Sequence, residues 1–329
     1  MYELILGSWC SAVIGAVAEL GVADAMSDEP RSATALAQQL GTDPDCLHRL
    51  LATGTDIGLF QGHNPGHFSL TALGRTMRDD TADSMRGFAR WVASPTERGS
   101  TAYLAEAVRS GNAVFEHAHG KPAFAFLRDN PGVQAVFNAG MSDISAQITA
   151  GVVSAYDFSA HHTLVDVGGG QGRLLAAILA AHPHLQGVLY DQPEVVEQAQ
   201  PVLKRAGVAD RCRVLGGDFL TEVPQGGDAY LLSSVIHNWD DAQAAHILSL
   251  CRDAASTKGR VLMAEAVLPP AGHHALAIRL LDLSMLANCN GRQRTETEFA
   301  DLCHQAGLSL VRTHQASDMC SLLEARRRS

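Results

Sequence analysis

A glycine-rich stretch between residues 164 and 175 constrains the fold of this chain more than any other segment. It reads Leu-Val-Asp-Val-Gly-Gly-Gly-Gln-Gly-Arg-Leu-Leu. A short apolar run that ends in glycines and continues into helically spaced apolar residues predicts a buried strand turning tightly into a helix. Glycine suits such a turn because a Cβ would collide with a ligand and because positive φ becomes accessible. The unpaired N–H groups of the helix start then favour a nucleotide-type ligand.

The spacing of these glycines distinguishes between two ligands. A dinucleotide fingerprint requires glycine at the first, third and sixth positions, and the sixth position counted from Gly168 is Arg173. Instead, alternate residues are Asp166, Gly168, Gly170 and Gly172, and Asp191 ends the next apolar run, 187–190. An acid at that place can accept both ribose hydroxyls of an adenosine. The pattern therefore favours an adenosine site over NAD and over a purely structural strand-to-helix turn.

Composition narrows the class of protein. The chain has 329 residues, of which 46% are hydrophobic and 18% charged, and this predicts a globular protein of two domains. A formal net charge of −10 disfavours a nucleic-acid partner. Seven cysteines without a C-x-x-C pair suggest neither a disulfide framework nor a zinc site, and they predict a reduced, cytoplasmic protein. The apolar run 4–18 is too short to span a bilayer, so no membrane partner is expected.

Residues 4–26 are predicted to form one buried helix. Apolar side chains occupy nearly every face of this stretch. A helix that is apolar all round must be buried, and a first helix is often buried by a second subunit. A homodimer is therefore the favoured interpretation, and an ordinary first core helix is the alternative.

The next segments predict a winged helix. Residues 32–40 and 43–53 have helical patterns, and 60–70 has the pattern of a small β-wing whose tip is Asn64-Pro65-Gly66. The second helix offers only His48 and Arg49 as cations, whereas a DNA-binding face needs several. A structural role is therefore favoured over DNA binding.

Strands and helices alternate after the glycine turn, which predicts a parallel, doubly wound sheet. The last two strands are separated by about five residues, too few for a crossover, and should form an antiparallel hairpin. Beyond the strand before the glycine turn, the predicted strands are 187–190, 212–215, 229–236, 261–267, 309–313 and 319–325.

Four separated motifs identify a resemblance to a known family. The run 166–172 is followed in order by Tyr190-Asp191-Gln192-Pro193, Gly217-Asp218-Phe219 and Ile236-His237-Asn238-Trp239. From about Val22 to the C-terminus the chain resembles the S-adenosylmethionine-dependent O-methyltransferases of the plant caffeate and bacterial polyketide type. The resemblance implies a mainly helical winged-helix dimerisation domain over 1–98. It implies a seven-stranded α/β methyltransferase domain over 99–329, with its last strand antiparallel.

Three ionisable residues carry the predicted chemistry. His237, at the end of one predicted strand, and Glu265 both reach the carboxyl edge of the sheet, where ligands of open α/β sheets bind. A neutral imidazole is a competent base for a phenolic acceptor, and a carboxylate beside it fixes its tautomer. The resemblance implies that His237 is the base, with Glu265 and Glu296 holding it. The alternatives are that His237 is a satisfied structural residue and that Glu296 only caps a helix beginning near Thr295.

The resemblance implies the remaining site residues. The residues expected at the cofactor are Ser145, Gly168, Gly170, Asp191, Asp218, Phe219 and Ser233. Those expected at the acceptor are Phe137, Met141, Asn238, Trp239, Met285 and Asn288, although an apolar face such as that of Phe137 and Met141 is often only core. Asn238 departs from the family, which commonly has Asp there. No histidine pair has a carboxylate or cysteine at ligand spacing, so no metal is expected.

The predicted function is methyl transfer from S-adenosylmethionine to a hydroxyl of a small aromatic secondary metabolite. One alternative is methylation at nitrogen or carbon on the same scaffold, where His237 would orient the acceptor. Another is a non-catalytic, cofactor-sensing winged-helix regulator, against which the acidic composition and His237 both speak.

Overall fold

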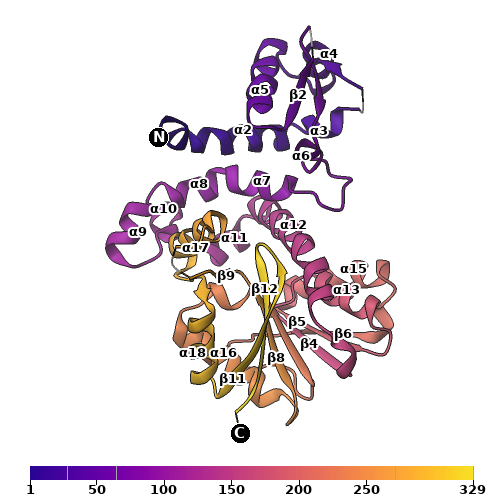
Figure 1. Ribbon diagram of the computed structural model, residues 1–329, viewed down its shortest axis with the longest axis vertical. Coiled ribbons are helices and arrows are strands. Elements are labelled where there is room, and N and C mark those ends of the chain that lie inside the picture. The colour runs from indigo at the N-terminus through magenta and orange to yellow at the C-terminus, as the bar shows by residue number, and fades with distance from the viewer. Residues whose placement is uncertain (28, 64, 271, 329) are drawn as a thin grey trace. The chain divides into compact units, whose positions relative to one another are not determined.

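The computed structural model describes residues 1–27, 29–63, 65–270 and 272–328. The chain forms two compact units, one built from Met1–Ala102 and His117–Ala146 and the other from Tyr103–Glu116 and Gln147–Ser329. The chain therefore passes between the units three times, whereas a single boundary between residues 98 and 99 was predicted. As the resemblance implies, a mainly helical N-terminal part is followed by a C-terminal α/β part (Figure 1).

The winged helix lies within the first unit. Its antiparallel sheet has the order β1-β3-β2. Asp43 caps α5 by accepting a hydrogen bond from the Cys46 N–H at 2.9 Å, and Pro44 is the first helical residue, as the sequence predicts. The predicted wing tip includes Asn64, which is outside the described residues. The elements are β1 (Arg31–Ser32), α4 (Ala33–Leu40), α5 (Pro44–Asp56), β2 (Phe60–His63), β3 (His67–Leu70) and α6 (Ala72–Arg75).

The N-terminal segment is not one continuous buried helix, and this prediction was wrong. It consists of α1 (Tyr2–Ile5), α2 (Gly7–Glu19) and α3 (Val22–Ala25). Gly21 breaks the helix because it adopts a left-handed φ of 65°. The end of α2 is buried in this chain, whereas Leu4 is 78% and Trp9 is 70% exposed. The apolar residues near the end of α2 are therefore buried in the core, whereas those of α1 and the start of α2 are exposed to solvent in the single chain.

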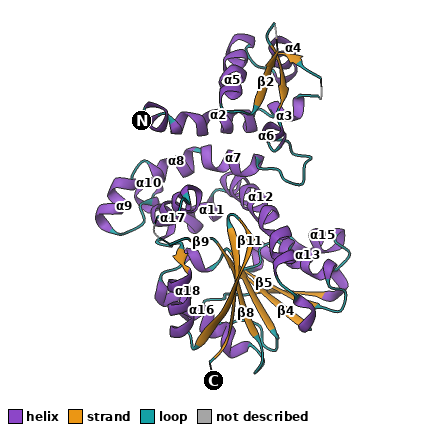
Figure 2. Cartoon of the chain, viewed as in Figure 1, coloured by secondary structure: helices purple, strands orange, loops and turns teal. Residues whose placement is uncertain are grey.

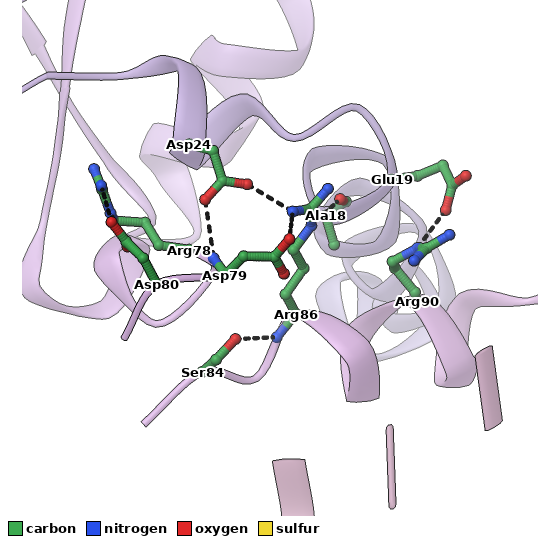
Figure 3. Close-up of polar contacts among 9 residues, drawn as sticks. All are labelled: Ala18, Glu19, Asp24, Arg78, Asp79, Asp80, Ser84, Arg86 and Arg90. Atoms are coloured by element: carbon green, nitrogen blue, oxygen red, sulfur yellow. Dashed lines mark hydrogen bonds and ion pairs between the residues drawn. The ribbon is translucent and has the colours of Figure 1, made fainter. Parts of the chain in front are cut away.

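Helix α7 (Arg86–Ala93) packs closely along α2. A Cβ at Gly15 of α2 would lie only 2.1 Å from the Cβ of Ala93, so this crossing requires glycine. Figure 3 shows how Arg86 ties the contact together: its side chain donates to the carbonyl of Ala18 at 2.8 Å and to Asp24 at 2.6 Å. Arg90, one turn later, pairs with Glu19 of α2.

The segment 117–146 joins the first unit because α12 (Pro131–Ala155) packs on α7. Asp143 accepts a hydrogen bond from the Phe88 N–H at 3.1 Å. A Cβ at Gly87 would lie 2.7 Å from the carbonyl carbon of Ala139. This contact between distant segments explains why the division differs from the predicted one. The other helices outside the α/β unit are α8 (Pro95–Thr101), α10 (Phe115–His119), which straddles the division, and α11 (Ala123–Asp129).

The second unit contains a seven-stranded sheet with the order β11-β12-β8-β7-β4-β5-β6. Strands β8, β7, β4, β5 and β6 are parallel, and β12 pairs antiparallel with both β8 and β11. The predicted doubly wound sheet and terminal hairpin are therefore confirmed. The seven strands are β4 (Thr163–Val167), β5 (Gln186–Asp191), β6 (Cys212–Gly216), β7 (Ala229–Ser233), β8 (Arg260–Glu265), β11 (Leu308–Ser317) and β12 (Cys320–Arg327).

Helices cover both faces of this sheet. Helices α16 and α18 lie on one side and α13 and α15 on the other (Figure 1), and the strands cross the unit as a twisted fan (Figure 2). The strands read as continuous apolar runs because both of their faces are buried. The remaining elements are α9 (Leu104–Ser110), α13 (Arg173–Ala181), α14 (Pro193–Val196), α15 (Ala199–Arg205), α16 (Asp241–Ala254), β9 (Val267–Leu268), α17 (Leu276–Cys289), β10 (Arg294–Thr295) and α18 (Glu296–Gln305). Three short 3₁₀ turns are η1 (Phe158–Ala160), η2 (Ala209–Arg211) and η3 (Ile236–Asn238).

The α2–α7 crossing generates a prediction about Gly15. Alanine is the better helix former, yet in Gly15→Ala its methyl group would collide with Ala93, so the packing penalty should win. We expect the free energy of unfolding, measured by urea denaturation, to fall by about 1–3 kcal/mol. Gly7→Ala is the matched control, because a Cβ there meets nothing within 4 Å, and it should leave stability unchanged or slightly raised. Equal stabilisation by both substitutions would contradict the crossing.

Candidate active site

The predicted site residues of the second unit gather at one edge of the sheet. The parallel strands run in the spatial order β8-β7-β4-β5-β6, and their carboxyl ends meet at this edge. In chain order, β4 is followed by β5 on one side and later by β7 on the other, so the edge above β4 is a topological switch point. Ligands of open α/β sheets bind at such a point.

The glycine turn follows β4 at this switch point. Gly168 and Gly170 have positive φ values of 70° and 59°, which explains why glycine is required. A Cβ at Gly168 would lie 2.7 Å from Val235, whereas a Cβ at Gly170 would meet nothing within 4 Å. The Gly168 end of the turn therefore packs against Val235, which follows β7, whereas the Gly170 end has open space beside it. Helix α13 begins directly after it.

Two carboxylates lie beneath and beside the turn. Asp191 ends β5 and accepts hydrogen bonds from the Gly170 N–H at 2.8 Å and from the Gln192 N–H at 2.7 Å. Asp166 on β4 is fully buried, and neither of its oxygens has a hydrogen-bond partner among the described residues. Burial, with a further contribution from the charge of Asp191, raises the pKa of Asp166 to about 7. Burial likewise raises the pKa of Asp191, against the effect of its two N–H donors.

The next strands contribute the other predicted cofactor residues. Asp218 and Phe219 follow β6, and Asp218 accepts a hydrogen bond from the Leu220 N–H at 2.9 Å. A Cβ at Gly168 would be 3.5 Å from the Phe219 ring, so Phe219 flanks the glycine turn. Ser233 is the last residue of β7. These positions place the predicted residues along one edge, and their contacts with a cofactor stay predictions.

His237 lies on a 3₁₀ turn beyond β7. The strand ends at Ser233 rather than at Ile236 as predicted, because Ser234 adopts a positive φ of 55° that interrupts the extended backbone. Residues Ile236–Asn238 then form η3. The turn brings the imidazole over the end of the neighbouring strand β8, where Glu265 is the last residue.

Glu265 holds this turn and its imidazole together. Its Oε1 accepts hydrogen bonds from the Val235 N–H at 3.0 Å and the Ile236 N–H at 2.8 Å, and its Oε2 lies 2.6 Å from His237 Nδ1. The Glu265 side chain is fully buried and that of His237 is 16% exposed. Because a carboxylate only accepts, Nδ1 must carry the proton, and the neutral ring then has its lone pair on Nε2. Nε2 has no hydrogen-bond partner in the described part of the chain.

Glu296 does not join His237, and this part of the prediction requires correction. Glu296 is the exposed first residue of α18, and its carboxylate accepts a hydrogen bond from the Thr313 hydroxyl at 2.8 Å. It does not cap the helix either. The capping box is formed by Thr295 and Glu298, whose carboxylate accepts from the Thr295 N–H at 2.8 Å. The helix start directs Glu296 toward β11 and not toward η3.

The end of helix α17 lies beside η3. Cys289, its last residue, has its sulfur 4.0 Å from the Asn238 side chain and 3.5 Å from the carbonyl of Met285. The Asn288 amide donates to Ser284 at 3.1 Å within the same helix. Asn238 itself donates to the Ser234 carbonyl at 3.2 Å. An aspartate, which is common here in the family, has no N–H to make that bond, so Asn238 is matched to the unusual backbone of Ser234.

Trp239 and Phe137 pack against other aromatic rings in the structure. The Trp239 ring contacts Phe219 edge-to-face at a centroid distance of 6.1 Å. Phe137 on α12 packs edge-to-face on Trp91 within the first unit, at 5.0 Å. Met141 and Ser145 lie on the same helix. The roles predicted for these residues toward acceptor and cofactor stay predictions.

Sequence reasoning missed two buried side chains in the segment between α17 and α18. Gln293 is 3% exposed, and its amide oxygen has no hydrogen-bond partner among the described residues. Arg294 is only 1% exposed and donates to the backbone of the η3 turn. In the sequence, Gln293 and Arg294 stand out only as two polar residues directly before the helix cap Thr295. Such a pair is common on protein surfaces, so it does not indicate burial.

Other kinds of site find no support in the described ranges. No group of three or more histidine, cysteine, aspartate or glutamate side chains there is placed to hold a metal ion. Among the same residues, no helix combines the length and the apolar character that crossing a lipid bilayer requires.

Comparisons with known proteins agree with this geometry. Residues 101–309 match the model of an O-methyltransferase domain, and residues 2–80 match that of an O-methyltransferase dimerisation domain. The phenazine O-methyltransferase PhzM of Lysobacter antibioticus is 38% identical over 99% of this chain and 95% of its own length. The 8-amino-8-demethylriboflavin N,N-dimethyltransferase of Streptomyces davaonensis is 32% identical over 99% of this chain and 94% of its own length.

A solved structure shows the same fold. CalO1, a methyltransferase in calicheamicin biosynthesis crystallised with S-adenosylhomocysteine, is 34% identical, and the two chains superpose with a TM-score of 0.89. The alignment covers 99% of this chain and 97% of CalO1. An adenosine-type turn at a switch point, a histidine held by a buried carboxylate and these full-length similarities lead to one conclusion. This chain belongs to the S-adenosylmethionine-dependent O-methyltransferases that carry an N-terminal dimerisation domain.

Proposed function

We propose that this enzyme methylates a phenolic hydroxyl of a small aromatic secondary metabolite, with His237 as general base and Glu265 as the residue that orients it. The observation that carries the proposal is the 2.6 Å contact between His237 Nδ1 and the buried Glu265 carboxylate. It leaves Nε2 as the only ring atom able to take a proton. The relatives named above act on a phenazine and on a riboflavin derivative, and both names describe aromatic acceptors.

Proton removal at the acceptor is the step that needs a base. A phenol with a pKa near 10 is mostly protonated at neutral pH, and a neutral imidazole within hydrogen-bond distance can accept its proton. Glu265 then lies beside the imidazolium that forms and stabilises its charge. Glu296 has no part in this proposal because it contacts Thr313 instead.

The residues at the glycine turn fit S-adenosylmethionine. Bound there, this cofactor supplies an electrophilic methyl group on its sulfonium sulfur. Asp191 ends β5 beside the turn and suits ribose hydroxyls, and the space next to Gly170 admits a ligand close to the backbone. Asp166 is buried without a partner among the described residues, so its carboxylate suits the cationic amino group of the methionine part. We propose these as the cofactor contacts.

An aromatic amine is the second candidate acceptor. The N,N-dimethyltransferase that is 32% identical to this chain motivates it. An amine already has a free lone pair, so His237 would need only to orient it and to receive its proton after transfer. The regulator alternative loses its basis, because the chain belongs to a family of enzymes.

A homodimer is the proposed assembly. The match to a dimerisation domain over residues 2–80 coincides with the exposed apolar residues of α1 and the start of α2. Large apolar side chains gathered at one place on a surface are typical of an interface. These side chains are Met1, Tyr2, Leu4, Ile5 and Trp9.

We predict that His237→Ala lowers kcat by about 10² to 10⁴, the range typical of general base catalysis, without changing the affinity for S-adenosylhomocysteine measured by calorimetry. Turnover of a phenolic acceptor by the Ala variant should rise with pH up to the pKa of the phenol, about 10, because only the ionised phenol then reacts.

His304→Ala is the control, since His304 is exposed at the end of α18. Its turnover should stay within about twofold of wild type, an effect worth less than 1 kcal/mol of barrier. An His237→Ala variant that retained wild-type rates on the phenol would refute the assignment of the base.

We predict that Asp166→Asn changes how stability depends on pH. The folded pKa of about 7 lies above the unfolded value of 3.8. Between these values the folded carboxyl keeps a proton that the unfolded one has lost, so its contribution to stability falls as pH rises through this window. Without cofactor, Asp166→Asn should be more stable than wild type at pH 8 and gain less at pH 5, as measured by urea denaturation.

The same substitution should weaken binding of S-adenosylhomocysteine at pH 8, because the amide cannot attract the ammonium group. Asp157→Asn is the control, since Asp157 is an exposed carboxylate at the start of η1. An Asp166→Asn variant less stable than wild type at pH 8 would contradict the cost of burying this charge.

We predict a dimer of roughly twice the 34.9 kDa chain mass in light scattering. Replacing Leu4 and Trp9 together with Asp should shift the protein toward the monomer, because both side chains are exposed in the single chain. Replacing the exposed Val311 of β11 with Asp controls for the removal of a surface apolar group. A wild-type protein that is monomeric and active at micromolar concentration would exclude the proposed assembly.

A further inference from the structure

Arg294 is the largest fully buried side chain described in this protein, and it lies directly behind the turn that carries His237. Its guanidinium donates to the carbonyl of Ile236 at 3.2 Å and to that of Trp239 at 2.9 Å. The same group donates twice to one carboxylate oxygen of Asp241, at 2.7 and 2.9 Å. A buried cation is costly unless it is paired and hydrogen-bonded. The four hydrogen bonds of Arg294 go to the two ends of η3 and to the start of α16.

The residues before Arg294 hold the middle of the same turn. The Arg292 N–H donates to the carbonyl of His237 at 2.8 Å. A Cβ at Gly291 would lie 2.1 Å from that oxygen, so the two backbones touch. Strand β10 is itself anchored, because Arg294 pairs with Val267 of β9, two residues after Glu265. The segment 291–294 therefore packs against η3 and forms hydrogen bonds with its backbone.

The turn is thus gripped from two sides by complementary groups. Glu265 accepts the N–H groups of Val235 and Ile236 together with the imidazole proton. Arg294 donates to the carbonyls on the opposite side of the same turn. A short 3₁₀ turn has weak hydrogen-bond geometry of its own, so its exact placement depends on such external partners.

We propose that Arg294 is a positioning residue for the reaction: by fixing both ends of η3, it sets where His237 Nε2 stands relative to the acceptor. The inference rests on the proposed role of His237 as base. Arginine is required and lysine is not equivalent. A planar guanidinium reaches three acceptors at once with fixed geometry, whereas an ammonium is a single point charge on a flexible stem.

Arg294→Lys tests the proposal because it keeps the buried charge and removes the fork. We expect kcat for a phenolic acceptor to fall by about 10- to 100-fold, since a displacement near 1 Å at a reacting group costs this much. Affinity for S-adenosylhomocysteine should stay within about twofold, because the glycine turn is supported by β4 and β5. An Arg294→Lys variant with wild-type kcat would overturn the proposal.

Arg260→Lys is the matched control for loss of a guanidinium. Arg260 begins the strand that Glu265 ends, and its Nε pairs with Glu324 at 2.8 Å at the other end of β8. This variant also loses a guanidinium from an ion pair, and it should keep its kcat. A kcat that fell equally in both variants would show that Arg294 acts only through stability. Asp241→Asn, which weakens the grip on Arg294 at a half-exposed position, should lower kcat in the same direction and serves if Arg294→Lys does not fold.

A double-mutant cycle separates this inference from the function on which it rests. If Arg294 acts through His237, Arg294→Lys in the His237→Ala background should lower kcat by less than about twofold further, because residues that act as a unit are not additive. A full additional 10- to 100-fold loss there would overturn the positioning role. Wild-type kcat in His237→Ala alone would instead refute the proposed base, whatever Arg294 does.

Discussion

The carboxylate of Glu265 is the interaction on which the rest of the active site depends. A buried charge of this kind is tolerated only where its lone pairs are occupied. Two backbone N–H groups and the ring of His237 occupy them here. Because Glu265 ends β8 and its donors follow β7, the spacing of two hydrogen-bonded strands determines where the imidazole stands. The Glu265 carboxylate therefore both satisfies two buried backbone N–H groups and selects the tautomer of His237 that is protonated on Nδ1.

Local patterns in the sequence predicted most of the second unit correctly, for physical reasons. Gly168 and Gly170 adopt positive φ values that glycine tolerates better than other residues, and Asp191 ends the buried strand β5 after an apolar run. The short link before β12 permits nothing but a hairpin. His237 and Glu265 were placed together because the carboxyl ends of adjacent parallel strands meet at one edge. Each of these inferences needs only nearby residues and the rules of chain geometry.

The failures share a dependence on contacts between distant segments. The pairing of β10 with β9 determines which of the side chains of Arg294, Glu296 and Glu298 is buried. The spacing of apolar and polar residues in this part of the sequence does not reveal that pairing. The early end of β7 depends on Ser234, whose positive φ is matched by the amide of Asn238. Residues 4–26 have the composition of one helix, yet their division into three follows from how the chain turns at Gly21.

The position of β12 bears on how the protein is made. This strand inserts between β8 and β11, and its Ser321 pairs with Glu265. During synthesis on the ribosome, β8 emerges long before β12, so one side of the strand that ends in Glu265 stays unpaired in the nascent chain. An open, apolar strand edge is a template for association with other chains. The terminal hairpin therefore covers this edge of β8, and a nascent chain that lacks the hairpin exposes it to other chains.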